Sequence, residues 1–308
     1  MLEERHVQMA REVLDDFERD LGLFVPSSVD SSSAILRAKA DLERRQRGEI
    51  VGLPWADEWP ALARRIGPIE PSSLTVIAAR PSVGKSMFAM QLSRSLAAMG
   101  KRVMFVSREL SVVRLMRRNW VAYGGSMFTL KSGCPTPSDL QAIDTYDRES
   151  QGWDLHYDDH SKTVDEVRKE AEGLAPDIVI IDYLQRLAYD TEKEYAAITR
   201  IVNELQDFTL ETEIPVVCLS QLSRPMKGNE WKPPSMSDVR GSGAVEERAA
   251  NMVLLHRRWE SVDDTDTKTA KVQTEDGWFQ IEKCADGETG KPIPVRFNGA
   301  RMTIQEKL

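Results

Sequence analysis

Residues 74–86 read Leu74-Thr75-Val76-Ile77-Ala78-Ala79-Arg80-Pro81-Ser82-Val83-Gly84-Lys85-Ser86. The apolar start predicts a strand, the small residues before Lys85 predict a phosphate-binding loop, and the following Met87–Met99 segment predicts a helix. In such a loop the backbone N–H groups surround the phosphates, Lys85 contacts the β and γ phosphate oxygens, and the Ser86 hydroxyl binds Mg²⁺. We therefore predict a nucleotide triphosphate site formed by Arg80, Pro81, Ser82, Val83, Gly84, Lys85 and Ser86.

Ala79 occupies the position at which the phosphate-loop consensus opens with Gly. A plain glycine turn is the alternative interpretation, because many glycine-containing segments only reverse the chain. The strand before the loop and the helix after it favour nucleotide binding.

Bulk composition limits the classes of protein to which the chain can belong. With 308 residues, 41% of them hydrophobic, the chain can bury the core of one large α/β domain plus a small appendage. A net charge of −8 argues against a surface that coats nucleic acid, although a local basic loop remains compatible with it.

The cysteines and the apolar segments bear on the compartment. Three widely spaced cysteines indicate neither a disulfide framework nor a zinc site, which fits a reducing cytoplasm. Apolar runs stay short of a membrane span, and the amino terminus is charged where a signal peptide would be apolar. We expect a soluble cytoplasmic protein without a membrane partner.

Two short helical segments precede the strand–loop–helix unit. Residues 1–24 have an amphipathic helical pattern, residues 26–33 are rich in Ser and break it, and a charged helix is predicted at residues 34–48. An isolated helix of this length is marginal in water, so it either docks on another surface, such as a neighbouring subunit, or is a solvated tail. We therefore divide the chain into residues 1–48 and a domain at residues 49–308.

Strands and helices alternate from residue 72 onward, which is typical of a mainly parallel sheet with crossover helices. The predicted strands are short and apolar, as in sheets covered on both faces: Leu74–Ala78, Arg102–Ser107, Asp177–Ile181, Pro215–Ser220 and Met252–His256. The predicted helices lie at about 87–99, 111–123, 138–150, 164–173 and 194–212. An antiparallel meander is predicted at the end of the chain, with strands at Trp278–Lys283, Pro292–Asn298 and Arg301–Gln305.

Polar side chains follow three of the predicted strands and are candidates for catalysis. Asp182 ends an apolar strand, where ligands bind in open α/β sheets, and we expect it to face the Mg²⁺. Glu109 follows the strand that ends at Ser107 and is the candidate base for the attacking water, the alternative being a surface acid. Gln221 follows another strand and offers an amide that can sense the γ phosphate, the alternative being a plain polar residue at a strand end.

Two segments after Gln221 are candidates for contact with nucleic acid. Residues 224–234 are basic and rich in Pro and Gly, and a small-residue turn at residues 240–244 precedes a helix and exposes N–H donors, although such turns are often only turns. The predicted contacts are Arg224, Lys227, Arg240, Gly241 and Gly243.

Four residues between a predicted strand at Trp153–Tyr157 and the helix near Val164 are metal ligands by type. They are His156, Asp158, Asp159 and His160. Because they come from one segment, we do not expect a metal site, and we interpret the Asp and Ser residues there as turn and cap residues.

In order along the chain, these motifs resemble the RecA-like motor domain of DnaB-type replicative helicases, the hexameric superfamily 4 group, over about residues 50–305. The markers are the phosphate loop with Ala79, which many members share, Ser107-Arg108-Glu109-Leu110 followed by Arg118, Asp182-Tyr183-Leu184-Gln185, Ser220-Gln221-Leu222, and Ser237-Asp238-Val239-Arg240 leading to Ser242-Gly243-Ala244. The Asp-Tyr-Leu-Gln and Ser-Gln-Leu runs are more specific than the phosphate loop.

The resemblance implies a RecA-like P-loop NTPase that forms a ring, binds ATP and Mg²⁺ between subunits, moves on single-stranded DNA and unwinds duplex DNA in the 5′→3′ direction during replication. It implies that Glu109 is the catalytic glutamate and that Lys85 and Gln221 take part in hydrolysis. It also implies that Arg240, Gly241 and Gly243 hold the strand, and that residues 34–48 are a linker helix on the next subunit.

The chain departs from the family pattern in two places. The 48 residues before the motor are too few for the family's N-terminal helical domain, which contacts primase. Near the end, Lys283-Cys284-Ala285-Asp286-Gly287 stands where the family usually has Lys-Gln-Arg-Asn-Gly, so the expected arginine finger is Ala285. Loss of the finger predicts a slow ATPase; Lys283 would supply part of the charge in the ATP site, and Arg296 or Arg301 would be replacements.

The leading hypothesis is an ATP-dependent DNA helicase or translocase, encoded by a phage or mobile element in view of the short amino-terminal region. A second hypothesis is an ATP-binding adaptor that needs a partner helicase to complete its active site. A recombination ATPase of the RecA family is a third, although its sequence would lack the Asp-Tyr-Leu-Gln and Ser-Gln-Leu runs. Predicted partners are single-stranded DNA, further copies in a ring hexamer, and a replication helicase, loader or primase.

Overall fold

The structure is a computed structural model that describes residues 30–48, 51–187, 194–223, 232–239, 242–263 and 269–307. The predicted helix within residues 1–24 lies outside the described residues. The chain divides into two compact units between Val51 and Gly52.

Helix α2 (Ser31–Gln46) belongs to the first unit. It begins before the predicted start at Ala34, because the Asp30 carboxylate caps it: Oδ1 accepts hydrogen bonds from Ser32 N at 2.9 Å and from Ser33 N at 3.1 Å. Ser31, Ser32 and Ser33, which belong to the segment predicted to interrupt helical structure, are therefore its first turn. That this helix docks on a neighbouring subunit stays a prediction.

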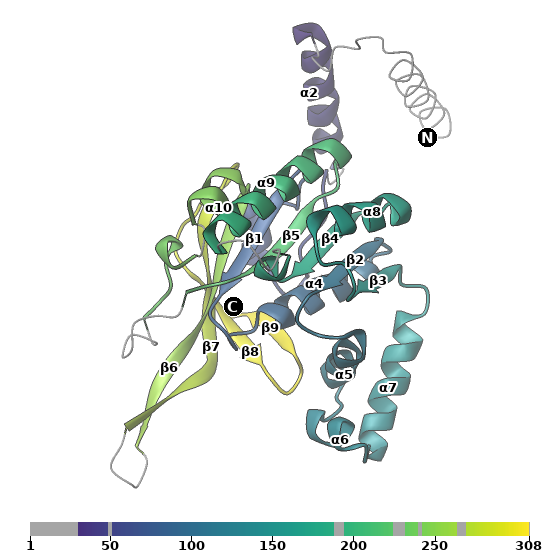
Figure 1. Ribbon diagram of the computed structural model, residues 1–308, viewed down its shortest axis with the longest axis vertical. Coiled ribbons are helices and arrows are strands. Elements are labelled where there is room, and N and C mark those ends of the chain that lie inside the picture. Colours follow the sequence, from purple (N-terminus) through teal and green to yellow (C-terminus); the bar gives the residue numbers. More distant parts are fainter. Residues whose placement is uncertain are drawn as a thin grey trace. The chain divides into compact units, whose positions relative to one another are not determined.

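The second unit is built on one sheet, whose described strands run in the order β3-β2-β4-β5-β1-β6-β7-β8-β9 (Figure 1). The strands are β1 (Leu74–Ala79), β2 (Val103–Ser107), β3 (Leu155–Asp158), β4 (Ile178–Asp182), β5 (Val216–Gln221), β6 (Asn251–Asp263), β7 (Thr269–Cys284), β8 (Ile293–Asn298) and β9 (Thr303–Glu306). Pairing is parallel from β3 to β6 and antiparallel from β6 to β9. The predicted fold class, a mainly parallel α/β sheet with an antiparallel extension, is confirmed.

Helices cover both faces of this sheet. They are α3 (Pro60–Ile66), α4 (Lys85–Ala98), α5 (Val112–Ala122), α6 (Met127–Ser132), α7 (Pro137–Ser150), α8 (Val164–Leu174), α9 (Glu194–Thr212) and α10 (Ser242–Arg248). One apolar core lies on the α4 face and includes Phe88 and Phe279, and the other lies on the α9 face and includes Ile201 and Leu205. Strands β1, β2 and β4 are buried at every position, because they lie between these cores. No helix among the described residues is long and apolar enough to span a bilayer.

Strands β6 and β7 form a hairpin that is much longer than the sequence pattern predicts. The predicted bounds, Met252–His256 and Trp278–Lys283, cover only the part paired within the domain; the strands extend to Asp263 and back to Thr269. The strand predicted at Met252–His256 was identified by its run of apolar residues, and the residues after His256 are mostly polar. The two strands satisfy their backbone groups by pairing with each other, so the ladder continues past the end of the apolar pattern.

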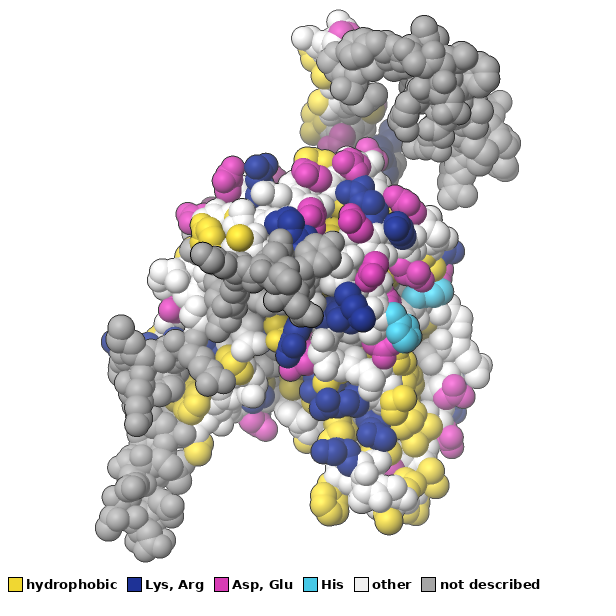
Figure 2. All heavy atoms as spheres, in the orientation of Figure 1, with side chains coloured by type: hydrophobic (Ala, Val, Ile, Leu, Met, Phe, Trp, Pro, Cys, Tyr) yellow, Lys and Arg dark blue, Asp and Glu magenta, His cyan; other side chains and the backbone are white. Residues whose placement is uncertain are grey.

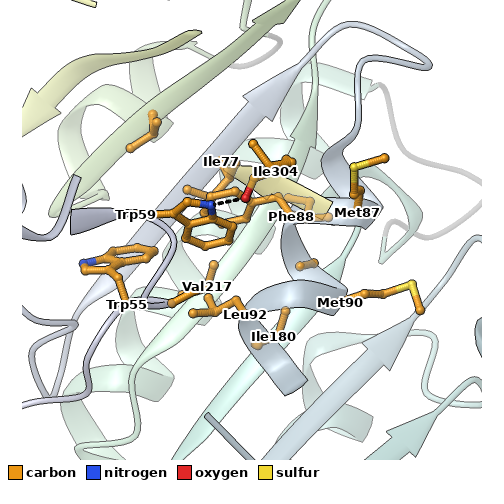
Figure 3. Close-up of a cluster of buried hydrophobic side chains, with 14 of the residues drawn as sticks. Trp55, Trp59, Ile77, Met87, Phe88, Met90, Leu92, Ile180, Val217 and Ile304 are labelled. Atoms are coloured by element: carbon orange, nitrogen blue, oxygen red, sulfur yellow. Dashed lines mark hydrogen bonds between the residues drawn. The ribbon is translucent and has the colours of Figure 1, made fainter. Parts of the chain in front are cut away.

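A cluster of aromatic side chains joins the segment before the sheet to its last strand (Figure 3). The Trp59 ring stacks on Phe88, with 4.1 Å between ring centroids and 8° between planes. The indole Nε1 of Trp59 donates a hydrogen bond to Ile304 O at 2.9 Å. The backbone of Ile304 also contacts Gln91 of α4: Gln91 Nε2 donates to Ile304 O at 3.0 Å, and Ile304 N donates to Gln91 Oε1 at 2.7 Å. Strand β9 is thereby fixed against α4, the helix that follows the phosphate loop.

Candidate functional site

The carboxyl ends of four adjacent parallel strands bring the predicted catalytic residues to one edge of the sheet. In the ladder between β2 and β4, Ser107 pairs with Asp182, and in the ladder between β1 and β5, Ala79 pairs with Gln221. Glu109 follows β2 by two residues and Lys85 follows β1 by six, so both start from the same edge. The four residues predicted for one site therefore share that edge.

The phosphate loop has a backbone that requires glycine at position 84. Gly84 has φ 132°, and a Cβ atom placed there would lie 3.2 Å from two carbons of the Phe297 ring. The loop leads into α4, which begins at Lys85 and buries this residue to 8% exposure. Lys85 Nζ donates a hydrogen bond to Ala79 O at 3.3 Å. Burial lowers the pKa of Lys85, while the nearby carboxylates of Asp182 and Glu109 raise it.

A cavity of about 340 Å³ opens beside this loop. Its walls combine the loop, the start of α4 and the ends of β2 and β5, and consist of Pro81, Ser82, Gly84, Lys85, Ser86, Met87, Glu109, Arg118, Gln221 and Met302. The structure thus gathers most of the predicted nucleotide contacts around one space. Val83 is buried in the core instead, and it would offer only backbone atoms to a ligand.

Asp182 lies behind the phosphate loop and is fully buried. Among the described residues neither of its carboxylate oxygens has a hydrogen-bond partner. Burial, together with the charge of Glu109, raises the pKa of Asp182 to about 6, although the Ser86 hydroxyl, Lys85 and Arg118 oppose the rise. A buried carboxylate with two unsatisfied oxygens beside a hydroxyl is a set of hard oxygen donors. The residues present therefore fit Mg²⁺, with Ser86 and Asp182 as the groups that would hold it.

Glu109 is positioned by a turn at the end of β2. Ser107 Oγ donates to Leu110 O at 2.6 Å and accepts from Leu110 N at 3.2 Å, which closes the chain around Glu109. Arg108 N donates to Asp182 O at 2.7 Å, so the ends of β2 and β4 are tied together. These bonds hold the candidate base and the candidate metal ligand on adjacent strand ends.

Gln185 supports Gln221, a role that the sequence analysis did not assign. Gln185 Oε1 accepts from Gln221 N at 3.1 Å, and Gln185 Nε2 donates to Ser220 Oγ at 2.9 Å and to Gln221 O at 3.2 Å. The side chain after β4 thus fixes the backbone of the residue that ends β5. Gln185 is the last residue of the Asp-Tyr-Leu-Gln run, which the sequence analysis singled out as specific. A polar side chain directly after a buried strand was the signal that could have identified this role.

Arg118 is a second residue that the sequence analysis did not place in the site. It lies on α5 and lines the cavity beside Glu109. Burial lowers its pKa and Arg114 lowers it further, whereas Asp182 and Glu109 raise it. Its position nine residues after Glu109 gives no local signal for this place, because the place depends on how α5 packs.

Arg80 belongs to the phosphate loop, but its guanidinium faces the segment at residues 232–239. Nη1 donates to Lys232 O at 2.7 Å, and Nη2 lies 3.9 Å from Asp238 Oδ2. The same segment is held to the end of β5 by Ser223 N donating to Asp238 O at 2.8 Å. The loop that would bind the phosphates is therefore in contact with the segment that adjoins the predicted DNA contacts.

Lys283 lies away from the cavity of its own chain. It pairs with Met252, which is level with Val76 in the first half of β1, whereas the phosphate loop follows the other end of this strand. Its Nζ donates to Glu246 O at 2.5 Å and to Glu247 O at 3.3 Å. Within one chain, Lys283 is therefore not brought to the nucleotide pocket.

The residues considered in place of an arginine finger lie in different surroundings. Ala285 is exposed, and its N–H donates to Ala250 O at 2.9 Å. Arg296 pairs with Glu275 through Nη2 at 2.9 Å. Arg301 follows β8, with its guanidinium over Gly124.

Most of the predicted DNA contacts fall outside the described residues, namely Arg224, Lys227, Arg240 and Gly241. Gly243 is described and lies in the first turn of α10, so the helix begins within the segment that was predicted to be a turn. Its contact with DNA stays a prediction.

The two Asp residues interpreted as turn and cap residues lie at the end of β3 and in the connection to α8: Asp158 is the last residue of the strand, and Asp159 follows it. Asp158 Oδ1 accepts from His160 N at 2.8 Å and from Ser161 N at 3.0 Å, and Asp159 Oδ2 accepts from Val112 N at 2.9 Å. These carboxylates are occupied by backbone N–H groups.

The fold and the cavity together define a phosphate-loop nucleotide-binding protein with a RecA-like sheet. Residues 57–306 match the family model described as the DnaB-like helicase C terminal domain. The chain belongs to the DnaB-like helicase family.

Two curated relatives illustrate this membership. The chain is 32% identical over 222 residues to the replicative DNA helicase DnaB of Geobacillus stearothermophilus, an alignment covering 68% of this chain and 48% of the relative. It is 32% identical over 239 residues to a probable plasmid replicative DNA helicase of Chlamydia psittaci, covering 73% and 51%. The chain thus spans about half the length of these relatives.

Two solved structures share the fold. The first is an ATPase domain, which superposes with a TM-score of 0.77 and 24% identity, covering 92% of this chain and all of that domain. The second is a DnaB-like replicative helicase, studied with its interactions with primase, which gives a TM-score of 0.73 and 22% identity, covering 98% of this chain and 76% of the other. The antiparallel C-terminal strands are therefore part of a fold seen elsewhere in this family.

Proposed function

We propose that this chain is the motor of an ATP-dependent DNA helicase, which hydrolyses ATP with Mg²⁺ while it moves along single-stranded DNA and unwinds duplex DNA in the 5′→3′ direction during replication. The observation that carries the proposal is the convergence of Lys85, Glu109, Asp182 and Gln221 at one edge of the sheet. Lys85, Glu109 and Gln221 line the cavity beside the phosphate loop. Membership in the helicase family supports the same function.

Each residue has a distinct task in this proposal. Lys85, buried between two carboxylates, would bind the phosphates as a fixed positive charge. Glu109 would orient the attacking water and accept its proton. Gln221, whose backbone is held by Gln185, would place its amide near the γ phosphate without adding charge. Mg²⁺, when bound by Ser86 and Asp182, would neutralise part of the negative charge on the phosphates.

The test is ATP hydrolysis with and without single-stranded DNA, together with unwinding of a forked duplex. Glu109→Gln should lower kcat for ATP by about 10²–10⁴, because it removes the base, and should leave nucleotide binding intact. Lys85→Ala should weaken both binding and turnover. Both variants should lose unwinding.

Glu170→Gln and Lys169→Ala are matched controls, since both residues are exposed on α8. They should retain wild-type rates. Equal activity in wild type, Glu109→Gln and Lys85→Ala would overturn the proposal.

We also infer assembly into a ring hexamer. Lys283 does not line the nucleotide cavity of its own chain, so a contact of Lys283 with ATP requires the cavity of a neighbouring copy in a head-to-tail arrangement. Head-to-tail contacts close into rings when the rotation allows. Measuring particle mass with and without ATP and single-stranded DNA tests this inference; a monomer under every condition would refute it.

The alternative of an adaptor that needs a partner helicase is not favoured, because the curated relatives are themselves named replicative helicases. A loader or primase as partner, a cytoplasmic location, and a domain boundary near residue 48 stay predictions.

A further inference from the structure

A second cavity lies next to the nucleotide site and is lined almost entirely by cations. It has a volume of about 220 Å³ and is bounded by Arg114, Arg117, Arg118, Met127 and Lys131. Figure 2 shows Lys and Arg side chains gathered over α5 and α6, with hydrophobic side chains beside them. Arg118 lines both this cavity and the nucleotide cavity, so the two cavities are neighbours with this side chain in common.

Helical periodicity explains why these charges converge. Arg114, Arg117 and Arg118 are spaced i, i+3 and i+4 on α5, and Met127 and Lys131 are spaced i and i+4 on α6. Each set therefore lies on one face of its helix, and the two faces line the same cavity. Like charges at such spacings repel one another, so nothing in helix stability favours this arrangement. Arg118 shows the repulsion, because Arg114 lowers its pKa.

Within the part of the chain that the structure describes, none of these four cations has an ion pair or a hydrogen bond from its charged group. The nearby carboxylate of Asp139 is already occupied. It is 1% exposed and accepts hydrogen bonds from Ser126 N at 2.6 Å, Thr129 Oγ1 at 2.6 Å, and Thr136 N and Oγ1, both at 2.7 Å. Asp139 thus fixes the start of α6 and, among the described residues, forms no ion pair with the cations of the cavity. The carboxylates of Asp182 and Glu109 act on Arg118, which also lines the nucleotide cavity.

We propose that this cavity is a second phosphate-binding site, distinct from the phosphate loop. Three guanidinium forks and one ammonium group call for a ligand with more than one negative charge and several acceptor oxygens, which a phosphate group or pyrophosphate supplies and a single carboxylate does not. The ligand is the backbone of a nucleic-acid strand or a free phosphate anion, since both present the same oxygens.

One exposed side chain, next in sequence to a residue of the cavity wall, distinguishes these two sources. The Phe128 side chain is 81% exposed and follows Met127 directly on α6, three residues before Lys131. An exposed aromatic ring beside bound phosphates is a platform on which a base can stack. A free phosphate anion has no base and therefore cannot stack on this ring.

The experiment measures binding without ATP, so its outcome does not depend on helicase activity. Lys85→Ala removes the lysine of the phosphate loop, and pyrophosphate is titrated calorimetrically into the full chain carrying this change. Adding Arg117→Ala and Lys131→Ala should weaken the remaining binding by about tenfold or more, because two charge-assisted contacts are lost. Adding Lys162→Ala and Lys169→Ala, which remove two exposed lysines elsewhere, should leave it unchanged.

A second titration uses a single-stranded oligonucleotide and Phe128→Ala. Weaker binding of the oligonucleotide to the Arg117/Lys131 variant and to Phe128→Ala, with pyrophosphate affected only by the former, supports the site and assigns it to nucleic acid. An effect confined to pyrophosphate supports the site and assigns it to a free phosphate anion. If the Arg117/Lys131 variant binds both probes as tightly as its parent, or the parent binds neither, the proposal is wrong.

Discussion

Ala285 is a small, exposed residue on a short turn after β7, where members of this family usually have arginine. Its N–H donates a hydrogen bond to a backbone oxygen, and its side chain is exposed. A longer side chain at this position would therefore extend into solvent without disturbing that bond. If the head-to-tail ring forms, a cation here would approach the nucleotide of the next copy.

We predict that Ala285→Arg increases kcat for ATP. Arginine fingers contribute about 10³–10⁵ in related phosphoryl transfers, so even partial engagement should give at least a tenfold rise. Steady-state ATPase assays measure the change, with Ala285→Gln as an uncharged control of similar length. If both variants match wild type, position 285 does not face a nucleotide in the assembly.

His256 gives the domain a dependence of stability on pH. It is 2% exposed, its ring lies 4.4 Å from the Trp278 ring between centroids, and burial, together with the charge of Arg80, lowers its pKa from 6.5 to about 4. Between these values the unfolded chain binds a proton that the folded chain does not, so stability falls as pH falls from about 6.5 toward 4.

Urea unfolding at pH 7 and pH 5 tests this dependence. The loss of stability on acidification should be smaller in His256→Gln than in wild type. His160→Gln should behave as wild type, because that side chain is 96% exposed. An identical loss in all three proteins would contradict the assignment to His256.

At the scale of elements, the phosphate loop and the segment at residues 232–239 are in direct contact. The contact runs from Arg80 to Asp238 and Lys232, and Asp238 Oδ2 also accepts from Ser235 N at 3.0 Å. A shift of the loop on nucleotide binding would therefore act on the segment that precedes the predicted DNA contacts.

Asp238→Asn should weaken this connection by removing one charge while keeping the shape of the side chain. We expect DNA stimulation of the ATPase to fall about threefold or more, with the basal rate nearly unchanged, since couplings of this kind are worth about 0.5–2 kcal/mol. Asp144→Asn, an exposed acid on α7, is the control. Equal stimulation in the two variants would show that the contact does not transmit the signal.

The elements differ in how well the sequence predicts them. Strands such as β1 and β4 are continuous apolar runs because both faces are buried, so their predicted bounds differ from the structure by only a residue. Helix α6 was missed because it is short and has no buried residue. The outer parts of β6 and β7 were missed because strand pairing outside a core leaves no apolar pattern.

The same limit applies to the candidate site. Lys85, Asp182, Glu109 and Gln221 were predictable because each follows a recognisable strand. Arg118 belongs to a helix, and its place depends on how that helix packs, which local patterns do not encode.

At the scale of the whole domain, the first and last segments stabilise each other. Glu306 of β9 accepts hydrogen bonds from Ala61 N at 2.7 Å and from Leu62 N at 2.8 Å, so it caps the first turn of α3. These N–H groups would otherwise be unsatisfied, and a carboxylate is favourable at a helix amino terminus.

Glu306→Ala should lower the free energy of unfolding by about 1–3 kcal/mol, the range for hydrogen bonds to a charged group. Glu306→Gln should cost less, because one acceptor remains. Urea unfolding measures both variants, with Glu170→Ala as the control. A cost no larger than that of the control would mean that the cap does not stabilise the domain.

The hydrogen bond between Trp59 and Ile304 joins residues that are 245 positions apart in the sequence, so one partner is synthesised long before the other. At about 5–20 residues per second, a ribosome needs roughly 12–50 s to add the second partner after the first. During that interval the aromatic surfaces of Trp59 and Phe88 lack the strand that covers them, and Phe297, which packs against Gly84, is also still to come. The phosphate loop is therefore translated early but acquires its final walls only when the last strands leave the ribosome.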